Sequence, residues 1–508
     1  MKFYLSNSNK LQSTERKNIV ILFHSNWDDW FTYRTLYSVV YYDKEGVEFD
    51  LGSIKIGQFN MEEGQRIPNF PEIFKMLSDD FFSLGQDSSY YENLNKLGDS
   101  FRKGILEALN DLAFNTELYQ KALNENVTTS SLLRDVSNLS VEGQFRNLAN
   151  GNPNLTQYNF QYHYPQNNDL ILDFNVIPYT NPPTNLQVII GRNGVGKTYL
   201  FENMINALMS LQINNNEFGH FKENYWDTSN NLFANLIFIS YSSFDKIFPR
   251  KEERDKLENI KYSYIGLKVF DNETNNVRSK NPEDYDKEFK TSLEKCFLQG
   301  KGQRWSDALK ILEGDPLFKY YDITSINSAN EIKRAVELFE ILSSGHKIVL
   351  LTITKLVETL EEKSLVIMDE PETYLHPPLI SSYIRAISHL LIQKNAVAIV
   401  GTHSPVILQE VPKSCVWSIR RIGSETKVER LEYESFGENV ASLTHAVFGL
   451  EVQDSGFHNI LKSLTLKYNT YTEALGSLDG QLGFEGRAIL RNLFYLKGND
   501  EKDQQTKF

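Results

Sequence analysis

Eight consecutive residues have the make-up of a loop that holds phosphate groups: Gly191, Arg192, Asn193, Gly194, Val195, Gly196, Lys197 and Thr198. They match the pattern G-x-x-x-x-G-K-[ST]. Glycines let backbone N–H groups turn toward phosphate oxygens, a lysine ammonium binds the β- and γ-phosphates, and a threonine hydroxyl is a ligand for Mg²⁺. An apolar run at residues 186–190 predicts a buried strand before the loop, and residues 199–211 are compatible with a helix after it. The sequence therefore predicts a P-loop that binds a nucleoside triphosphate, with Thr198 as a ligand of Mg²⁺.

A pair of acidic residues, Asp369 and Glu370, follows a second apolar run at residues 364–368. Because neighbouring parallel strands end at the same edge of a sheet, we expect both carboxylates beside the P-loop. Asp369 is then placed to hold Mg²⁺, and Glu370 to act as the general base that takes a proton from the attacking water. An acidic pair after a strand is most often a solvated turn, but its combination with Lys197 and Thr198 favours hydrolysis of the bound nucleotide.

Two other segments could complete the phosphate site. A third apolar run, residues 396–400, leads to His403, which we expect at the same sheet edge as a sensor of the γ-phosphate. A predicted helix is preceded by Ser343, Ser344 and Gly345, whose hydroxyl and N–H groups suit a phosphate. A single histidine is more often packed or exposed, and a serine at a helix start is more often only an N-cap. The order of both segments relative to the acidic pair favours a role at the nucleotide.

In this order, the four segments resemble the ATP-binding-cassette (ABC) ATPases. The resemblance implies that residues 191–198 are the Walker A motif, Asp369 and Glu370 the Walker B motif, and His403 the switch histidine. It also implies that residues 342–346 are a variant of the LSGGQ signature, which contacts the γ-phosphate bound by a partner subunit. Two chains would then enclose ATP and Mg²⁺ in a head-to-tail homodimer, or within a higher oligomer.

The resemblance covers roughly residues 170–410, and the chain departs from the family pattern at two places. His346 stands where the signature usually has glutamine. No glutamine suited to a Q-loop follows residues 237–240, so that Ser242 or Asp245 would take its place. The residue that fills the Q-loop role stays open at this point.

Residues 369–377 and 401–405 resemble the RecF/OLD-like branch of the superfamily, which is grouped with the AAA family. The N-terminal region, residues 262–267 and the C-terminal tail resemble ATPases of bacterial anti-phage systems, nearest to the Septu-type PtuA ATPases. This resemblance implies an effector partner, an HNH nuclease of the PtuB type, and in some systems a retron reverse transcriptase with its nucleic acid. No convincing Asp-x-Asp cluster follows His403, so we expect no Toprim nuclease domain.

The main hypothesis is an ATPase that couples its nucleotide state to an effector in phage defence. Three alternatives stay open: a nucleotide-gated scaffold with little turnover, a RecF-like DNA-repair clamp and, least favoured, the ATPase subunit of a solute transporter. ATP turnover measured with and without phage nucleic acid distinguishes the scaffold, and ATP-dependent binding of duplex DNA by the protein alone distinguishes the clamp.

The pattern of apolar runs predicts an α/β protein, an ABC-type P-loop ATPase head with a mixed β-sheet. Residues 35–42 and 47–51 predict a β-hairpin near the N-terminus, and residues 415–422 and 427–433 a last hairpin. The expected domains are an N-terminal β-rich part of the ATPase head (1–65), a helical insertion (66–165), the P-loop ATPase core (166–250), a charged inserted lobe or mobile surface segment (251–330), the half of the core with the signature, Walker B and switch histidine (331–435), and a C-terminal helical region for partner docking (436–508).

Composition limits the classes of partner. The chain of 508 residues carries 53 basic and 66 acidic residues, a formal net charge of −13, which argues against a surface built as a whole for nucleic acid or anionic lipid. Its 2 cysteines, Cys296 and Cys415, lack the spacing of a disulfide framework or a zinc site. The N-terminus runs straight into polar residues without the apolar h-region of a signal peptide, and no apolar run is long enough to span a bilayer. We therefore expect a cytoplasmic protein without a membrane partner.

Overall fold

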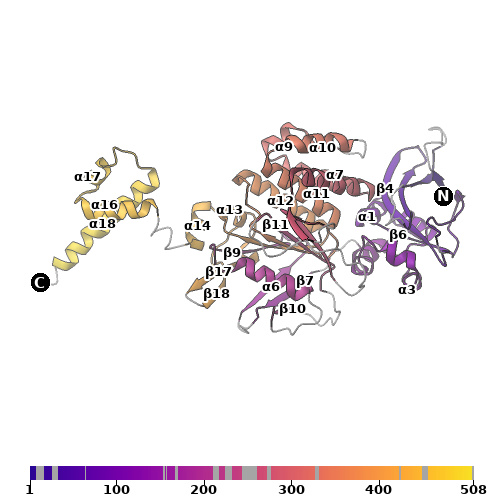
Figure 1. Cartoon of the computed structure of the whole chain (residues 1–508), viewed down its shortest axis with the longest axis horizontal. Helices are drawn as coiled ribbons and strands as arrows, with labels where there is room; N and C mark the ends of the chain where they lie inside the picture. The colour runs from indigo at the N-terminus through magenta and orange to yellow at the C-terminus, as the bar shows by residue number, and fades with distance from the viewer. Residues whose placement is uncertain are drawn as a thin grey trace. The chain divides into compact units, whose positions relative to one another are not determined.

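In the computed structural model, the described residues are 1–6, 16–25, 32–62, 64–152, 155, 157–165, 170–209, 217–223, 232–242, 260–271, 276–326, 331–422, 425–448 and 456–505. They form two compact units, Met1–Phe436 and Gly437–Phe508 (Figure 1). The first unit contains an N-terminal domain and a P-loop core, and the second contains the C-terminal helices.

The N-terminal domain is built on a six-stranded sheet with strand order β5-β1-β2-β3-β4-β6. Only β1 and β2 are parallel, and the predicted hairpin of β3 and β4 is confirmed. The strands are β1 (Lys2–Ser6), β2 (Ile19–His24), β3 (Leu36–Tyr42), β4 (Glu48–Gln58), β5 (Ile73–Phe74) and β6 (Phe81–Gly85). The helical segments that follow are α1 (Ser88–Lys96), α2 (Asp99–Ala108), α3 (Thr116–Ala122), η2 (Thr128–Leu132), α4 (Asn138–Ser140), η3 (Val141–Phe145) and α5 (Arg146–Ala149).

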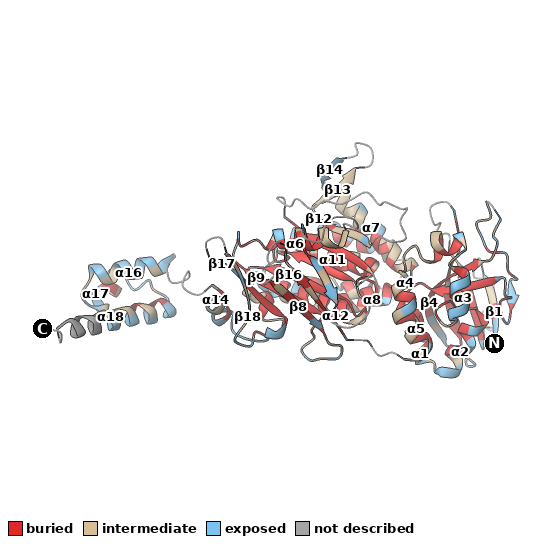
Figure 2. Ribbon diagram, turned by 90° about the horizontal axis from the view of Figure 1, so that it is seen from below, coloured by how far each residue is buried: buried red, intermediate tan, exposed pale blue. Residues whose placement is uncertain are grey.

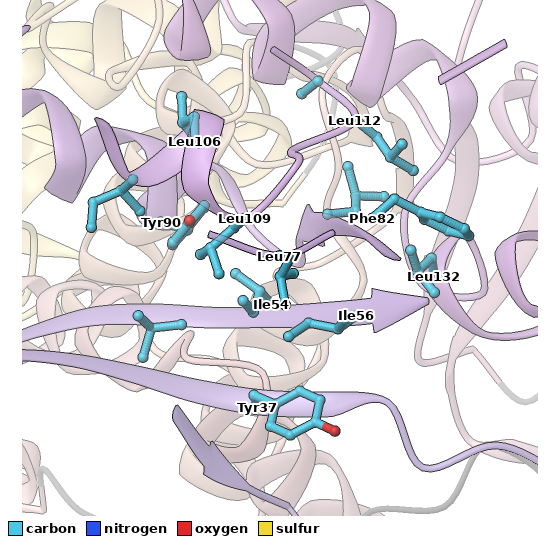
Figure 3. Close-up of a cluster of buried hydrophobic side chains, with 14 of the residues drawn as sticks. Tyr37, Ile54, Ile56, Leu77, Phe82, Tyr90, Leu106, Leu109, Leu112 and Leu132 are labelled. Carbon is cyan, nitrogen blue, oxygen red and sulfur yellow. The ribbon is translucent and has the colours of Figure 1, made fainter. Parts of the chain in front are cut away.

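One hydrophobic core joins this sheet to its helices (Figure 3). It extends along the chain from Phe3 to Ala149 and contains Ile54, Phe82 and Leu106, which are fully buried. In the described part of the chain, no strand of this sheet pairs with the sheet of the P-loop core. The structure thus differs from the predicted division: residues 1–65 are not part of the ATPase head, because the sheet buries its face against the helices of the predicted insertion.

The P-loop core is built on a seven-stranded sheet with order β12-β11-β15-β16-β9-β17-β18, in which only the β17–β18 pair is antiparallel. The central strands are buried on both faces (Figure 2), as expected for a parallel sheet covered by helices. The predicted α/β fold class and the predicted last hairpin are therefore confirmed. The strands are β9 (Leu186–Gly191), β11 (Asn235–Ser240), β12 (Lys261–Gly266), β15 (Leu365–Asp369), β16 (Val397–Thr402), β17 (Val416–Ile422) and β18 (Glu425–Arg430).

One face of this sheet packs against α6 (Lys197–Met209) and a three-stranded antiparallel sheet of β7 (Tyr158–His163), β8 (Ile171–Val176) and β10 (His220–Glu223). The opposite face is covered by a helical layer (Figure 1). Its helices are α7 (Pro282–Leu298), α8 (Gly302–Leu312), α9 (Pro316–Tyr320), η4 (Ile323–Ser325), α10 (Ile332–Ile341), α11 (Ser344–Thr359) and α12 (Pro377–Gln393). Two short helices, α13 (Pro405–Leu408) and η6 (Lys413–Cys415), lead to β17.

The predicted charged lobe, residues 251–330, becomes in large part a buried helical layer. After a short hairpin of β13 (Lys268–Asp271) and β14 (Asn276–Ser279), helices α7 and α8 bury Phe289, Leu293 and Trp305 completely. The interpretation as a mobile surface segment is thus wrong for α7–α9, because their charged residues form only the outer faces of amphipathic helices. Residues 251–259, 272–275 and 327–330 of this prediction lie outside the described residues.

The C-terminal unit contains α14 (Val440–Phe448), α16 (Phe457–Lys467), α17 (Tyr471–Gly476) and α18 (Phe484–Gln505). Its buried core is small and centres on Leu461, Ala474 and Leu490. Phe484 is 92% exposed and Leu466 86% exposed, so this unit presents large apolar side chains to its surroundings. Among the residues that the structure describes, no helix combines the length and the apolar character needed to cross a membrane.

Candidate nucleotide-binding site

The predicted P-loop connects the end of β9 to the start of α6. Gly194 and Gly196 have φ angles of 81° and 102°, which lie in the left-handed region that favours glycine. A Cβ atom at Gly191 would lie 2.6 Å from the carbonyl oxygen of Ile419 on β17. These three positions therefore need glycine for backbone reasons, two for their conformation and one for close approach of the next strand.

Lys197 folds back over the loop. Its side chain is buried, and Nζ donates hydrogen bonds to the carbonyl oxygens of Gly191 (2.9 Å) and Arg192 (3.0 Å). Nζ also lies 3.7 Å from Oε1 of Glu370. The ammonium group is thus held where the loop opens, surrounded by oxygen atoms that phosphate oxygens could replace.

Thr198 and Asp369 meet at the adjoining strand end. Oγ1 of Thr198 donates a 2.6 Å hydrogen bond to Oδ2 of Asp369, which is the last residue of β15. The two residues are 171 positions apart in the sequence. They come together because β9 and β15 are parallel strands separated by β16 alone, so that both strands end at the same edge of the sheet. A hydroxyl and a carboxylate oxygen are hard ligands, and with phosphate oxygens and water they fit the octahedral preference of Mg²⁺.

Glu370 and His403 face each other next to Lys197. Nδ1 of His403 lies 3.4 Å from Oε1 of Glu370, and the backbone of Glu370 has a φ of 46° that turns its side chain at the strand end. The contact with His403, and then the charge of Lys197, lower the pKa of Glu370 although burial acts in the opposite direction. The same contact raises the pKa of His403. Glu370 is therefore an ionised carboxylate that can accept a proton.

A further residue of this edge, Glu372, was not predicted from the sequence as a functional residue. Its side chain is buried, and Oε1 accepts hydrogen bonds from Oγ1 of Thr402 (2.5 Å) and from the backbone N–H of His403 (3.0 Å). Glu372 thereby fixes the segment that carries His403. The third acidic residue in the Asp-Glu-Pro-Glu run is the signal that could have indicated it.

The predicted signature segment lies at the start of α11 and has different neighbours. Oγ of Ser343 lies 2.6 Å from Nδ1 of His346, and a Cβ atom at Gly345 would lie 2.7 Å from the carbonyl oxygen of Tyr374. Ser343 and Ser344 are exposed. Within the described residues, no hydrogen bond or ion pair joins residues 343–345 to Lys197 or Thr198. The signature and the P-loop of one chain are therefore not brought together.

Of the two residues considered for the Q-loop, Asp245 lies outside the described residues. Ser242 follows β11, and its backbone N–H donates a 3.3 Å hydrogen bond to Oγ of Ser240. The assignment of the Q-loop residue stays a prediction.

Residues 209–409 match the family described as "AAA domain, putative AbiEii toxin, Type IV TA system". The matched segment contains residues 343–345, Asp369, Glu370 and His403 and begins after the P-loop. Together with the sheet order and the P-loop described above, this match supports a P-loop ATPase fold of the AAA/ABC type for the core.

Two solved structures are similar to part of the chain. An ATP-binding cassette of an ABC transporter in its ADP conformation is 11% identical, with 59% of this chain and 98% of that chain covered and a TM-score of 0.31. A nucleotide-free ATP-binding cassette from an ABC transporter is 12% identical, with 50% and 85% covered and a TM-score of 0.25.

A much higher similarity extends over nearly the whole length. Protein ea59 of Escherichia phage lambda is 37% identical over 504 residues, which cover 94% of this chain and 94% of that protein. Both the P-loop core and most of the N- and C-terminal regions are therefore shared with it. The chain belongs to the same family as Protein ea59 of Escherichia phage lambda.

Proposed function

We propose that this protein is a Mg²⁺-dependent ATPase whose nucleotide state regulates a partner effector protein. The observation that carries this proposal is the convergence of Lys197, the Thr198–Asp369 hydrogen bond and the ionised Glu370 at one sheet edge. Each of the three supplies a different part of the reaction: phosphate binding, metal binding and proton acceptance.

In this proposal, the N–H groups of residues 191–198 and the ammonium of Lys197 bind the phosphate chain, and Thr198 and Asp369 hold the metal ion. Bound Mg²⁺ supplies neutralisation of the charge on the β- and γ-phosphate oxygens. Glu370 accepts a proton from the water that attacks the γ-phosphate, so that ATP and water give ADP and phosphate. The phosphate oxygens take the place of the loop carbonyls that Lys197 now contacts.

The proposal includes a head-to-tail dimer in which residues 343–345 of each chain complete the site of its partner. Two observations support it: Ser343 and Ser344 are exposed at the start of α11, and they make no bond to the P-loop of their own chain among the described residues. The N-terminus of a helix attracts anions, so that this segment suits a phosphate presented by a second chain.

The effector is proposed to be a nuclease that acts in phage defence. The support is the sequence resemblance to Septu-type ATPases and the exposed apolar side chains of the C-terminal unit. Apolar side chains that gather into an exposed patch are typical of sites that bind other proteins. The rival function as a scaffold differs only in that turnover would be slow.

The nucleotide site is tested by Lys197→Ala with equilibrium binding of a fluorescent ATP analogue. Loss of Nζ removes the cation that faces the phosphates, and we expect nucleotide affinity to fall at least tenfold. The matched control is Lys333→Ala, whose exposed side chain on α10 lies 3.8 Å from Glu337, away from the P-loop residues. Equal affinity of wild type and Lys197→Ala would contradict the proposal.

The shared site is tested by mixing two inactive variants, Lys197→Ala and Ser344→Asp. Ser344 is preferable to Gly345 because a side chain at Gly345 would collide with Tyr374, whereas an acidic residue in the first turn of α11 is favourable for the helix. A mixed dimer has one site with both faces intact and should regain part of the ATPase activity. A mixture that stays inactive despite confirmed heterodimers would contradict sharing of the site.

Effector docking is tested by ending the chain after Phe436. The cut falls at the boundary between the two compact units, whereas a cut inside residues 437–508 would open the core around Leu461 and Leu490. We expect the shortened protein to hydrolyse ATP and to lose its effector in co-purification. Undiminished co-purification would contradict docking by the C-terminal unit and leave the ATPase proposal unaffected.

A further inference from the structure

Three potential metal ligands converge from three separate helix starts of the first unit. Asp315 caps α9, His346 lies in the first turn of α11, and His376 caps α12. Nε2 of His346 lies 3.1 Å from Oδ1 of Asp315, and Nε2 of His376 lies 3.6 Å from Oδ2 of Asp315. The three ligand atoms all lie within 4.8 Å of one another. This cluster is separate from the Thr198–Asp369 pair and is not used by the proposed ATPase reaction.

The burial of the three side chains differs in a way that suits a metal site. Asp315 is 2% exposed and His346 is 7% exposed, whereas the side chain of His376 is 53% exposed. Two ligands are thus held rigidly inside the protein, and the third faces solvent, from which an ion and a water ligand can enter. A buried carboxylate between two imidazole rings also supplies the negative charge that a divalent cation needs.

The chemistry of the donor set indicates which ion. Two imidazole nitrogens and one carboxylate oxygen are ligands that Zn²⁺ and other first-row divalent ions prefer, whereas Mg²⁺ prefers oxygen alone. With bonds of about 2.0–2.1 Å, the ligands of tetrahedral Zn²⁺ lie about 3.4 Å apart. The 3.1 Å from Nε2 of His346 to Oδ1 of Asp315 and the 3.6 Å from Nε2 of His376 to Oδ2 are each close to that value, and the two imidazole rings face different oxygens of the carboxylate.

The hydrogen bond of Ser343 adds a second, independent observation. Oγ of Ser343 lies 2.6 Å from Nδ1 of His346. A metal-bound imidazole carries its proton on the nitrogen that does not bind the metal, and a hydrogen-bond acceptor there fixes the ring orientation. Ser343 can accept that proton, and Nε2 of His346 would then bind the ion in place of its present 3.1 Å contact with Oδ1 of Asp315.

We propose that Asp315, His346 and His376 bind one divalent transition-metal ion, with Zn²⁺ as the best fit. The ion links the start of α11, where residues 343–345 lie, to the start of α12, which follows the Walker B segment. His346 stands where the signature usually has glutamine, and in this proposal the histidine is there to bind the metal ion. It does not depend on ATP hydrolysis or on dimerisation.

The competing explanation is a purely structural cluster of helix caps. Oδ1 of Asp315 accepts a 2.9 Å hydrogen bond from the backbone N–H of Leu317, and Nδ1 of His376 lies 3.4 Å from the backbone N of Leu379. The second contact is long for a hydrogen bond and costs little to lose. The two explanations differ in whether the chain binds Zn²⁺ at this position.

The test is a titration of the chelator-treated full chain with Zn²⁺ by calorimetry, without nucleotide and with excess Mg²⁺ to fill any oxygen-rich site. Co²⁺ is titrated in parallel, because its visible absorption is strong when two nitrogen ligands hold it in a tetrahedral site. We expect one ion per chain, a visible absorption band with Co²⁺ and a higher melting temperature with Zn²⁺. Absence of binding by the wild type would overturn the proposal.

The variants are chosen so that the helix caps survive. His376→Asn and Asp315→Asn keep residues that cap helices well, and His346→Gln introduces the residue usual in the signature. Each should weaken Zn²⁺ binding at least tenfold, whereas His458→Asn in the C-terminal unit should not. Circular dichroism and the melting temperature without Zn²⁺ show that each variant is folded. Unchanged Zn²⁺ affinity in all three variants would place the ion elsewhere and overturn the proposal.

Discussion

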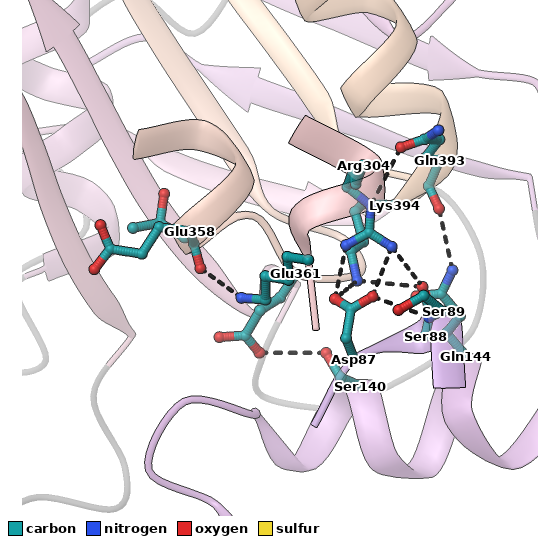
Figure 4. A network of polar contacts seen from close by, with 12 residues as sticks. Asp87, Ser88, Ser89, Ser140, Gln144, Arg304, Glu358, Glu361, Gln393 and Lys394 are labelled. Carbon is teal, nitrogen blue, oxygen red and sulfur yellow. Dashed lines mark hydrogen bonds and ion pairs between the residues drawn. The ribbon is translucent and has the colours of Figure 1, made fainter. Parts of the chain in front are cut away.

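Two polar regions of the first unit differ in what their charges can do. At the nucleotide edge, the side chains of Glu370 and His403 are only half-buried, so that a ligand or water can reach them. At the contact between the N-terminal domain and the P-loop core, Asp87 accepts two 2.7 Å hydrogen bonds from Arg304 and one of 2.7 Å from Lys394 (Figure 4). All three side chains there are at least nine-tenths buried. We call the first the exchangeable region, because Glu370 and His403 can change their partners when a ligand binds. We call the second the permanent region, because Asp87, Arg304 and Lys394 keep the same partners inside the folded protein.

The pKa of Asp87 shows how strongly its cationic partners hold it in the charged form. Burial alone would raise the pKa of its carboxyl group, but the charges of Arg304 and Lys394 outweigh burial and hold the pKa well below the ordinary value. Burial lowers the pKa of Lys394 to about 8. Removal of one charge among Asp87, Arg304 and Lys394 would leave an opposite charge buried without its partner, which strongly destabilises a fold.

The two regions are connected by helices. α11 starts at the signature segment, and just after its end Glu361 accepts a 2.7 Å hydrogen bond from the backbone N–H of Ser137 in the N-terminal domain. α12 starts at His376 and ends next to Lys394, which binds Asp87. The helices α11 and α12 therefore run from the proposed metal site to the contact with the N-terminal domain.

The largest expected effect is on turnover at the exchangeable region. Glu370→Gln keeps the size of the side chain but removes the base, so that the rate of ATP hydrolysis should fall about 10²–10⁴-fold while nucleotide affinity stays within a few fold. Steady-state phosphate release and equilibrium binding measure the two quantities. A matched control is Glu337→Gln on the exposed side of α10. Unchanged hydrolysis in Glu370→Gln would remove Glu370 from the catalytic role.

The second largest effect is on stability at the permanent region. Arg304→Met removes two hydrogen bonds from buried Asp87 and should lower the free energy of unfolding by about 3–5 kcal/mol, because the carboxylate keeps only Lys394 as a hydrogen-bonded cation, beside the backbone N–H of Ser89. Denaturant unfolding followed by circular dichroism measures the loss. The exposed pair Lys333–Glu337 provides the control, since Lys333→Met should change stability by less than about 0.5 kcal/mol. Equal effects of the two substitutions would contradict the comparison.

This contrast explains which parts could be predicted from the sequence. The nucleotide edge follows short motifs, because Gly191 to Thr198 and Asp369 to Glu370 each stand at the end of an apolar run that becomes a parallel strand. By contrast, Asp87 and Arg304 are 217 positions apart, and Asp87 and Lys394 are 307 apart. Nothing local marks such residues, since each alone is compatible with a solvated surface.

The same reason accounts for the other differences. The N-terminal sheet was assigned to the ATPase head because strand patterns do not reveal which sheet a strand joins. The helices α7–α9 were interpreted as a surface lobe because their charged outer faces dominate the composition of residues 251–330. The cluster of Asp315, His346 and His376 combines three distant segments that meet only through the packing of α9, α11 and α12.

A third prediction uses a second buried carboxylate of the N-terminal domain, which lacks the cations of Asp87. Asp111 accepts hydrogen bonds from the hydroxyl of Tyr91 and the backbone N–H groups of Ala113 and Phe114. Burial raises its pKa to about 7, although these hydrogen bonds act in the opposite direction. The folded state therefore holds a proton that the unfolded state has lost between about pH 4 and pH 7. The contribution of Asp111 to stability must fall as pH rises through that range, by up to about 1.4 kcal/mol per pH unit.

Asp111→Asn tests this dependence because an amide can still accept the backbone hydrogen bonds but does not titrate. The stability of the variant relative to the wild type should rise between pH 4 and pH 7 and stay constant above pH 8. Urea unfolding of both proteins at four pH values measures the difference, in which the titration of all other groups cancels. Parallel stability curves would show that Asp111 is ionised in the folded protein at every pH tested.

The smallest expected effect concerns Thr402, which makes a fully buried hydrogen bond next to the exchangeable region. The fully buried Thr402 donates its hydroxyl to Glu372 at 2.5 Å and accepts a 2.9 Å hydrogen bond from the backbone N–H of Ser404. Thr402→Val keeps the shape and removes both bonds, which should cost about 1 kcal/mol of stability. Because Glu372 also holds the backbone of His403, turnover should fall several fold while KM stays unchanged. Thr402→Ser retains the hydroxyl and should restore turnover. Equal turnover of the two variants would mean that His403 is positioned by the loop itself and not through Glu372.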